Sequence, residues 1–276
     1  MEQPKTPQGK AVKWILIAIG IVFLFFMLVM PLIVVLKEAF EQGWQFYKDA
    51  ITDEYTVKAL ILTLKATVAA VFVNTIFGLF AAWTMTKFRF KGKKLLTTLI
   101  DIPFAISPII AGLIFILTFG RIGWAYDILQ ALDIKIVFAV PGIILATIFV
   151  TFPFISREII PVLNAQGKDE EEAAALMGAS GLKIFFKVTF PHIKWAFLYG
   201  LILCTARAMG EFGAVSVLSG HLRGKTNTLP LHIEILYNEF NFTATFAVSS
   251  ILVVLAIVIL IVRNLVEYQG KKAGTK

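Results

Sequence analysis

Two side chains of opposite charge, Arg207 and Glu211, lie inside an apolar run that covers residues 195–219. A charge at the centre of a bilayer costs about 3 kcal/mol or more, so polar groups there pair or serve a function. A spacing of four residues places both side chains on one face of a helix, where they can form an ion pair. Two interpretations follow: the pair fixes helix packing, or it lines or gates a path for a polar solute.

Two further ionisable residues, Lys65 and Asp101, also lie within apolar runs, but nearer to the ends of those runs. We expect the long side chain of Lys65 to extend to the membrane surface. We expect Asp101 to form local hydrogen bonds. The two positions fall at different depths, so no ion pair between them is predicted.

A second place with unusual chemistry is the apolar segment DIPFAISPIIAGL, residues 101–113. Pro103 and Pro108 each remove a backbone donor and leave carbonyl groups without partners. Lipid cannot satisfy those groups, so the segment should face protein or a water-filled cavity. The segment is either an ordinary kinked helix or a site where exposed backbone and the Ser107 hydroxyl contact a substrate.

Residue groupings typical of enzymes are not visible in the sequence. His192, His221 and His232 lie outside the apolar runs, and no nucleophile–base pair accompanies them. The segment 220–226 is close to a phosphate-binding loop, but three residues separate its first glycine from Gly-Lys, where the motif needs four. A single cysteine, Cys204, excludes a disulfide within the chain and a zinc site built from thiols. We predict no catalytic, metal or ATP site in this chain.

The elements that must position these residues are membrane helices. Apolar residues make up 58% of the chain and charged residues 16%, against about 45–50% and about 25% in soluble proteins. Runs of about 20 apolar residues cross a bilayer as helices, and the alternating pattern of a barrel is absent. The first run has 23 residues, too long for the apolar core of a signal peptide. We predict an all-α protein with six spans, at residues 14–36, 59–86, 97–119, 136–157, 195–219 and 244–263.

The distribution of Lys and Arg predicts the orientation of these spans. On the side that holds the N-terminus, the tails and loops carry 17 of these residues, and on the opposite side they carry 7. Cytoplasmic loops are enriched in Lys and Arg, so both termini are predicted to be cytoplasmic. The tails are residues 1–13 and 264–276. We attribute the net charge of +8 to membrane topology and not to nucleic-acid binding.

The predicted cytoplasmic loop 158–194 contains the stretch EEAAALMGASGLKIFFKVTFP, residues 171–191. Acidic residues begin a short helix, Gly178 ends it, Ser180 begins a second helix, and Pro191 ends or kinks that helix. Helices that lie on lipid usually carry Lys and Arg on the polar face. Four consecutive acidic residues instead favour a basic groove on a partner protein.

This loop resembles the cytoplasmic motif of permease subunits in bacterial ABC importers, which reads Glu-Ala-Ala, three residues, Gly, nine residues and Ile-x-Leu-Pro. Val188 and Phe190 replace the aliphatic pair of that motif. The resemblance implies a type I importer permease (MetI-like) fold in the bacterial inner membrane. It also implies that the loop docks on a dimer of ATPase subunits, which holds ATP-Mg, so this chain binds no cofactor. Motif residues that match are Glu172, Ala173, Ala174, Gly178 and Pro191, with Glu172 facing the ATPase.

The segment 206–241 and the sequence PFAISPIIAGL resemble the sulfate permeases of the CysW type. This implies import of sulfate and thiosulfate, a second permease of the CysT type and an extracytoplasmic sulfate-binding protein. Molybdate or tungstate import is the alternative within the family. A secondary anion transporter with a proton-coupled Arg207–Glu211 pair, or a membrane scaffold, are alternatives outside it. Residues that can line or gate the path are Ser107, Pro108, Arg207, Glu211 and Ser216, with further hydroxyls at Thr205 and Ser219.

Overall fold

The computed structural model describes residues 7–274, and within that range every regular element is helical. Residues 1–6 and 275–276, which belong to the two predicted tails, lie outside the described residues. The α-helices are α1 (Pro7–Leu24), α2 (Met30–Ala39), α3 (Gly43–Thr52), α4 (Glu54–Lys87), α5 (Lys93–Ala105), α6 (Pro108–Phe119), α7 (Tyr126–Ala131), α8 (Val140–Thr151), α9 (Pro153–Gln166), α10 (Asp169–Leu176), α11 (Gly181–Ile184), α12 (Phe190–Met209), α13 (Gly213–Ser219), α14 (Leu229–Asn238) and α15 (Phe242–Gly274). Two π-helical segments are η1 (Phe25–Val29) and η2 (Phe185–Thr189).

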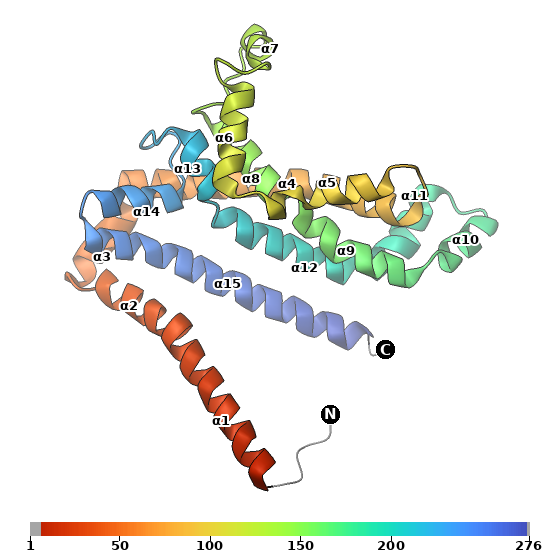
Figure 1. Ribbon diagram of the computed structural model, residues 1–276, viewed down its shortest axis with the longest axis horizontal. Coiled ribbons are helices and arrows are strands. Elements are labelled where there is room, and N and C mark those ends of the chain that lie inside the picture. The colour runs from red at the N-terminus through yellow and green to blue at the C-terminus, as the bar shows by residue number, and fades with distance from the viewer. Residues whose placement is uncertain (1–6, 275–276) are drawn as a thin grey trace.

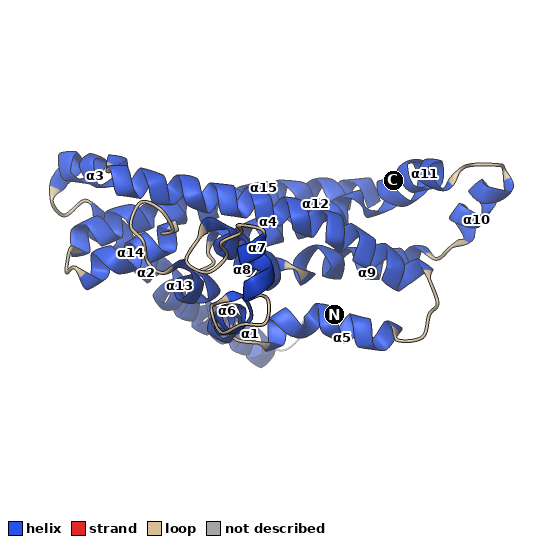
Figure 2. Cartoon of the chain, turned by 90° about the horizontal axis from the view of Figure 1, so that it is seen from above, coloured by secondary structure: helices blue, strands red, loops and turns tan. Residues whose placement is uncertain are grey.

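The long helices α4, α12 and α15 run beside one another and form the body of the molecule (Figures 1 and 2). Helices α10 and α11 lie at one end of this body, and α3 and α14 lie at the other end. Five helices or joined helices are long and apolar enough to span a membrane, and a bent pair, α5 with α6, brings the number to six. The all-helical fold with up to six spans agrees with the prediction from the sequence.

The third predicted span is two helices, not one kinked helix. Helices α5 and α6 meet at an angle of 109°, and α6 turns away from the body toward α7 (Figure 1). The break falls at Ile106 and Ser107, directly before Pro108, and Ser107 has an extended backbone with φ −57° and ψ 134°. A residue before proline is pushed out of the helical region, which accounts for the position of the break. Pro103, in contrast, lies inside α5.

Pro191 does not end the second helix of the predicted cytoplasmic loop, so of the two predicted outcomes, an end or a kink, the end is excluded. The segment 181–209 runs as one candidate span through α11, η2 and α12. The π-helical segment η2 ends two residues before Pro191, and η1 ends two residues before Pro31. A proline cannot donate a hydrogen bond and crowds the carbonyl four residues earlier. The wider π turn accommodates each proline without stopping the helix.

The fifth predicted span, 195–219, is also interrupted. Helix α12 ends at Met209, and α13 begins at Gly213 after a short break. The break lies about 20 Å from the start of the predicted span, at a rise of about 1.5 Å per residue, and it directly follows the candidate span 181–209.

Helices α4, α9 and α12 pack closely around Ile155, which is fully buried in α9. A Cβ atom at Gly78 of α4 would lie 2.9 Å from the Cβ of Ile155, and one at Gly200 of α12 would lie 3.1 Å from its Cα. Small residues allow helix backbones to approach closely in membranes. The two glycines thus hold the three helices together as one unit.

A buried amide connects α4, α8 and α12 one turn further along. The side chain of Asn74 in α4 donates to the Thr151 hydroxyl at 2.7 Å and to the Ile148 carbonyl at 3.2 Å, both in α8. It also lies 3.8 Å from the sulfur of Cys204 in α12. Polar side chains of this kind join helices where lipid offers no competing partner. Cys204 is fully buried and has the packing role that its apolar surroundings indicate.

Replacement of Gly78 by alanine tests the contact with Ile155. We expect Gly78→Ala to lower the free energy of unfolding by about 1–3 kcal/mol, the usual cost of overpacking a core. Thermal denaturation of the detergent-solubilised protein measures this effect. Gly20→Ala is the matched control, because a Cβ there meets no atom within 4 Å. Equal stability of the two variants would contradict the packing described here.

Candidate functional site

The motif at residues 171–191 forms the helix, turn and helix that the sequence predicts. Helix α10 has Asp169, Glu170, Glu171 and Glu172 in its first turn, where they complement the positive end of the helix dipole. Gly178 follows the helix with φ +83°, a conformation that favours glycine. Ser180 occupies the position before α11, but its side chain makes no capping hydrogen bond.

The residues of this motif differ in what they expose. Glu172 and Ala173 are exposed, whereas Ala174 packs inward. At the tip of the turn, Leu176 is 90% exposed and Met177 is 82% exposed. These large apolar side chains lie at the end of the molecule that carries the charged loops, not along a span. An apolar tip beside the exposed carboxylate of Glu172 suits contact with another protein.

Arg207 and Glu211 form the ion pair that the sequence predicts, but they lie across a break and not on one helix. Arg207 is in the last turn of α12, and Glu211 is in the segment between α12 and α13. The Nη1 atom of Arg207 lies 2.6 Å from Oε2 of Glu211, and the side chains are 32% and 1% exposed.

The second carboxylate oxygen of Glu211 replaces a backbone acceptor that is lost at the helix break. Oε1 accepts a hydrogen bond of 2.8 Å from the backbone N–H of Ala214, in the first turn of α13. The N–H groups of a first helical turn have no partner within the helix, and lipid supplies none. Glu211 thus satisfies a freed backbone group while Arg207 balances its charge.

The two broken spans meet through their second helices, α6 and α13. A Cβ atom at Gly112 of α6 would lie 2.7 Å from the carbonyl oxygen of Ala214. A Cβ atom at Gly213 of α13 would lie 3.0 Å from the Cβ of Pro108. The structure therefore brings Pro108 next to the segment that contains Glu211, although more than a hundred residues separate them.

Ser107 and Ser216, the predicted hydroxyl contacts, are arranged differently. Ser107 is exposed at the start of α6, and its hydroxyl makes no capping bond. The Ser216 hydroxyl donates to the Gly213 carbonyl at 2.8 Å, so its proton is already engaged. Of these two residues, only Ser107 presents a free hydroxyl.

The other two charges within apolar runs have different environments. Asp101 of α5 pairs with Arg157 of α9, whose Nε lies 2.9 Å from its Oδ1, and Arg157 also stacks on Phe104. This pair between helices corrects the expectation of a purely local hydrogen bond for Asp101. Lys65 is exposed on α4 and has no ion pair with the residues that the structure describes.

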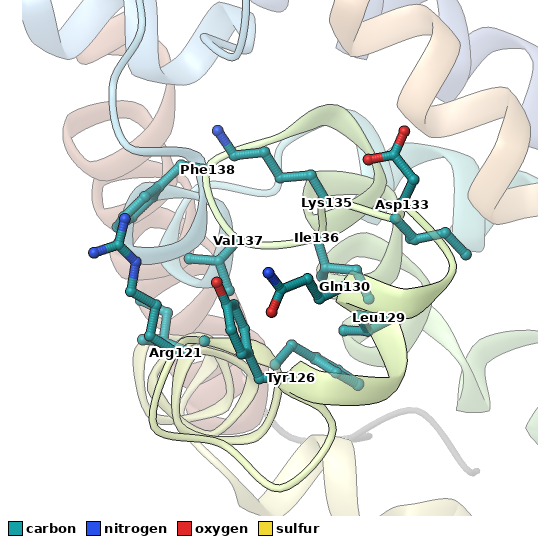
Figure 3. Close-up of a pocket in the computed structure, with 13 residues that line it drawn as sticks. Arg121, Tyr126, Leu129, Gln130, Asp133, Lys135, Ile136, Val137 and Phe138 are labelled. Atoms are coloured by element: carbon teal, nitrogen blue, oxygen red, sulfur yellow. The ribbon is translucent and has the colours of Figure 1, made fainter.

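A cavity of about 490 Å³ lies in the projecting segment between α6 and α8, away from the predicted site residues. Its lining comes from the end of α6, from α7 and from the segment 133–138. Figure 3 shows the Tyr126 hydroxyl and the Gln130 amide pointing into the ring of lining residues, while the Asp133 carboxylate extends away from it. The sequence carries no motif that marks this cavity.

A second cavity, of about 390 Å³, lies near the ends of α3, α4 and α14. His232 lines it and is 2% exposed, with its Nε2 atom 3.2 Å from the Thr56 hydroxyl. Burial, and next the positive charge of Arg223, lowers the pKa of His232 below its ordinary value of 6.5, although Asp53 and Glu239 oppose this shift. The sequence placed His232 outside the spans, which agrees with its position in the short helix α14.

A comparison with families of known proteins now defines the class of this chain. Residues 74–273 match the family described as the binding-protein-dependent transport system inner membrane component. The match covers more than half of the chain, so the chain belongs to this family of multi-pass membrane permeases. A solved bacterial alginate ABC transporter superposes with a TM-score of 0.78, covers 93% of this chain and 94% of its own, and is 17% identical. At that identity the likeness concerns the fold.

Individual relatives of this chain indicate a narrower class of permease than the family does. The sulfate transport system permease protein CysW of Synechocystis sp. (strain PCC 6803) is 44% identical over 261 residues, which are 95% of both chains. The sulfate transport system permease protein CysT of Salmonella typhimurium is 34% identical over 248 residues, which are 90% of both chains. These relatives are named as transport permeases, in agreement with a subunit that is not an enzyme.

A double-mutant cycle tests the pairing of Arg207 with Glu211. We expect Arg207→Met to destabilise the protein by about 3–5 kcal/mol, because the buried carboxylate of Glu211 then has no countercharge. The double variant Arg207→Met with Glu211→Gln should recover most of this loss, since glutamine keeps the acceptor for Ala214 without the charge. Thermal denaturation in detergent measures both. Arg223→Met, which breaks an exposed pair with Glu239, is the control and should have a much smaller effect. A double variant as unstable as the single one would contradict the pairing.

Acidification tests the burial of His232. Its folded-state pKa is lowered, so the unfolded chain binds a proton more readily than the folded chain does. The stabilising contribution is therefore complete above pH 6.5 and is lost as the pH falls below that value. We expect the denaturation temperature to fall between pH 7 and pH 5, and His232→Gln to reduce this dependence. A pH dependence that His232→Gln left unchanged would contradict the assignment.

Proposed function

We propose that this chain is a permease subunit of an ATP-driven importer and forms half of the transmembrane pathway for sulfate, with thiosulfate as a second substrate. The observation that carries the proposal is 44% identity to a CysW sulfate permease over 95% of both chains. The lower identity of 34% to a CysT permease favours the CysW position in a pair of homologous subunits. The second permease would then be of the CysT type.

The coupling to ATP is assigned to the motif around α10. Its exposed carboxylate at Glu172 and the apolar tip at Leu176 and Met177 support docking on a separate ATPase subunit. ATP and Mg²⁺ would bind to a dimer of that subunit and not to this chain. An extracytoplasmic sulfate-binding protein would deliver the substrate at the opposite end, near α3 and α14, in a complex within the bacterial cytoplasmic membrane.

The gate is assigned to the paired breaks in spans three and five. The outer halves α6 and α13 pack on each other through Gly112 and Gly213, so they can tilt together relative to the inner helices. Arg207 is partly exposed beside this joint and offers a cation to a tetrahedral dianion. The free hydroxyl of Ser107 and the backbone at Pro108 supply polar groups on the facing helix. Glu211 holds Arg207 in place and limits the net charge of the path.

Transport in proteoliposomes tests the proposed substrate and energy source. Vesicles that carry the complete complex, with the second permease, the ATPase and the binding protein, should take up labelled sulfate only when ATP is present. The ATP must be on the side of the membrane where the ATPase is bound. Excess unlabelled thiosulfate should reduce uptake, whereas molybdate should compete weakly. Uptake that continued at the same rate without ATP would indicate a secondary transporter. Stronger competition by molybdate or tungstate would indicate a permease for those anions.

Charge reversal at Glu172 tests the docking role of α10. We expect Glu172→Arg to reduce ATP-driven sulfate uptake by about tenfold or more, as loss of a charged contact at an interface commonly does. The variant should remain in the membrane, because Glu172 has no partner among the described residues. Glu41→Arg, at an exposed acidic residue between α2 and α3, is the control. Full uptake by the Glu172 variant would exclude this residue from coupling.

A further inference from the structure

An ion pair joins the coupling helix α10 to the end of span two. Nζ of Lys87, the last residue of α4, lies 3.0 Å from Oε1 of Glu171 in α10. The Lys87 and Glu171 side chains are only 7% and 16% exposed, although most of the surrounding loop is exposed. A pair that is removed from water to this degree is screened far less than a surface pair.

The same carboxylate also reaches the start of span five. The hydroxyl of Thr189, which is 2% exposed in η2, donates to Oε1 of Glu171 at 2.7 Å. Two lysine side chains add hydrogen bonds to backbone carbonyls at the same place. Nζ of Lys87 donates to the Gly167 carbonyl, and Nζ of Lys168 donates to the Lys87 carbonyl, each at 2.7 Å. One side chain, Glu171, thus connects α4, α10 and the segment that continues into α12.

Helix α10 has few other firm attachments. It is flanked by Gly167 with φ +73° and Gly178 with φ +83°, so both joints have backbone conformations that favour glycine. Its single buried residue is Ala174. A second pair, Glu170 with His192 at 2.7 Å, is about half exposed on both sides and is therefore well hydrated.

Consecutive acidic residues have different surroundings on this helix. Adjacent residues of an α-helix point about 100° apart. Glu171 faces the body of the molecule and meets Lys87 and Thr189, whereas Glu172 faces outward and is exposed. The inner acid is therefore placed to connect α10 with its own chain, and the outer acid is free for a partner.

We propose that the contacts of Lys87, Glu171 and Thr189, called here the clasp, carry a displacement of α10 to α4 and α12. The inference rests on the coupling role proposed for α10. Helices α4, α9 and α12 are already joined around Ile155, so an attachment to two of them moves all three. Without the clasp, α10 would turn on its glycine joints while the spans stayed in place. ATP hydrolysis would then continue without a matching movement of the pathway.

The ratio of sulfate taken up to ATP hydrolysed in the reconstituted complex tests the clasp. We expect Lys87→Met and Glu171→Gln each to lower this ratio by about tenfold, within the range that interactions between contacting residues produce. ATPase activity should be retained, because neither residue faces the ATPase. Lys91→Met is the matched control, since Lys91 is an exposed lysine of the same inner loop without a partner among the described residues.

Exchange of the two charges separates coupling from a merely structural role. Lys87→Glu combined with Glu171→Lys should restore the ratio to within about threefold of the wild type, because the pair forms again in the reverse sense. Recovery should be incomplete, since the Gly167 carbonyl then faces a carboxylate. A merely structural role would lower uptake and hydrolysis together and leave their ratio unchanged. That result, or no recovery on exchange, would overturn the proposal.

A distance measurement in the same complex does not depend on the substrate. Spin labels at Ala175 and Phe88, both exposed, report the separation of α10 from the end of α4. We expect one narrow distribution in the wild type, a broad one in Lys87→Met and a narrow one after the charge exchange. An unchanged distribution in Lys87→Met would overturn the clasp. If wild-type vesicles showed no ATP-driven sulfate uptake, the proposed function would fail, and this distance would still decide the clasp.

Discussion

The hydrogen-bonding requirement of the backbone inside a membrane constrains this whole structure. Hydrocarbon supplies no partner for a free N–H or carbonyl group, so a helix that stops within the bilayer must find its partners in the protein. The predicted spans three and five are both interrupted, at residues 106–107 and 210–212. Glu211 supplies an acceptor to α13, Arg207 balances its charge, and α6 covers the joint from the other side.

Close helix contacts form two groups in this structure. One group is α4, α9 and α12, in which Gly78 and Gly200 allow close contact with Ile155. The other group is the pair α6 and α13, which pack on each other through Gly112 and Gly213. Helix α13 also packs on α8, since Leu218 and Ala146 belong to one buried cluster. Under the proposed function, the first group would receive motion from the ATPase, and the second would open and close the path.

Much of the architecture could be predicted because apolar runs and loop charges are read directly from residue types. The positions of the spans and the helix, turn and helix around Gly178 follow from local preferences. The breaks could not be placed in this way, since the spacing of Arg207 and Glu211 is the same for a continuous helix and for the interrupted one. The pairs Asp101–Arg157 and Lys87–Glu171 were also missed. In the sequence, Lys87 and Arg157 look like other cations that set membrane topology.

The sequence by itself determined that the chain is a helical membrane protein with a polar helix, turn and helix around Gly178, because hydropathy, charge placement and glycine positions act over a few residues. Tertiary structure decided which charges meet, where the helices stop and which acidic residue of α10 faces inward. Those outcomes depend on contacts between residues far apart in the chain, such as Gly112 with Ala214 and Lys87 with Glu171. Their energies arise only when the helices pack, since burial removes the water that would otherwise satisfy each group.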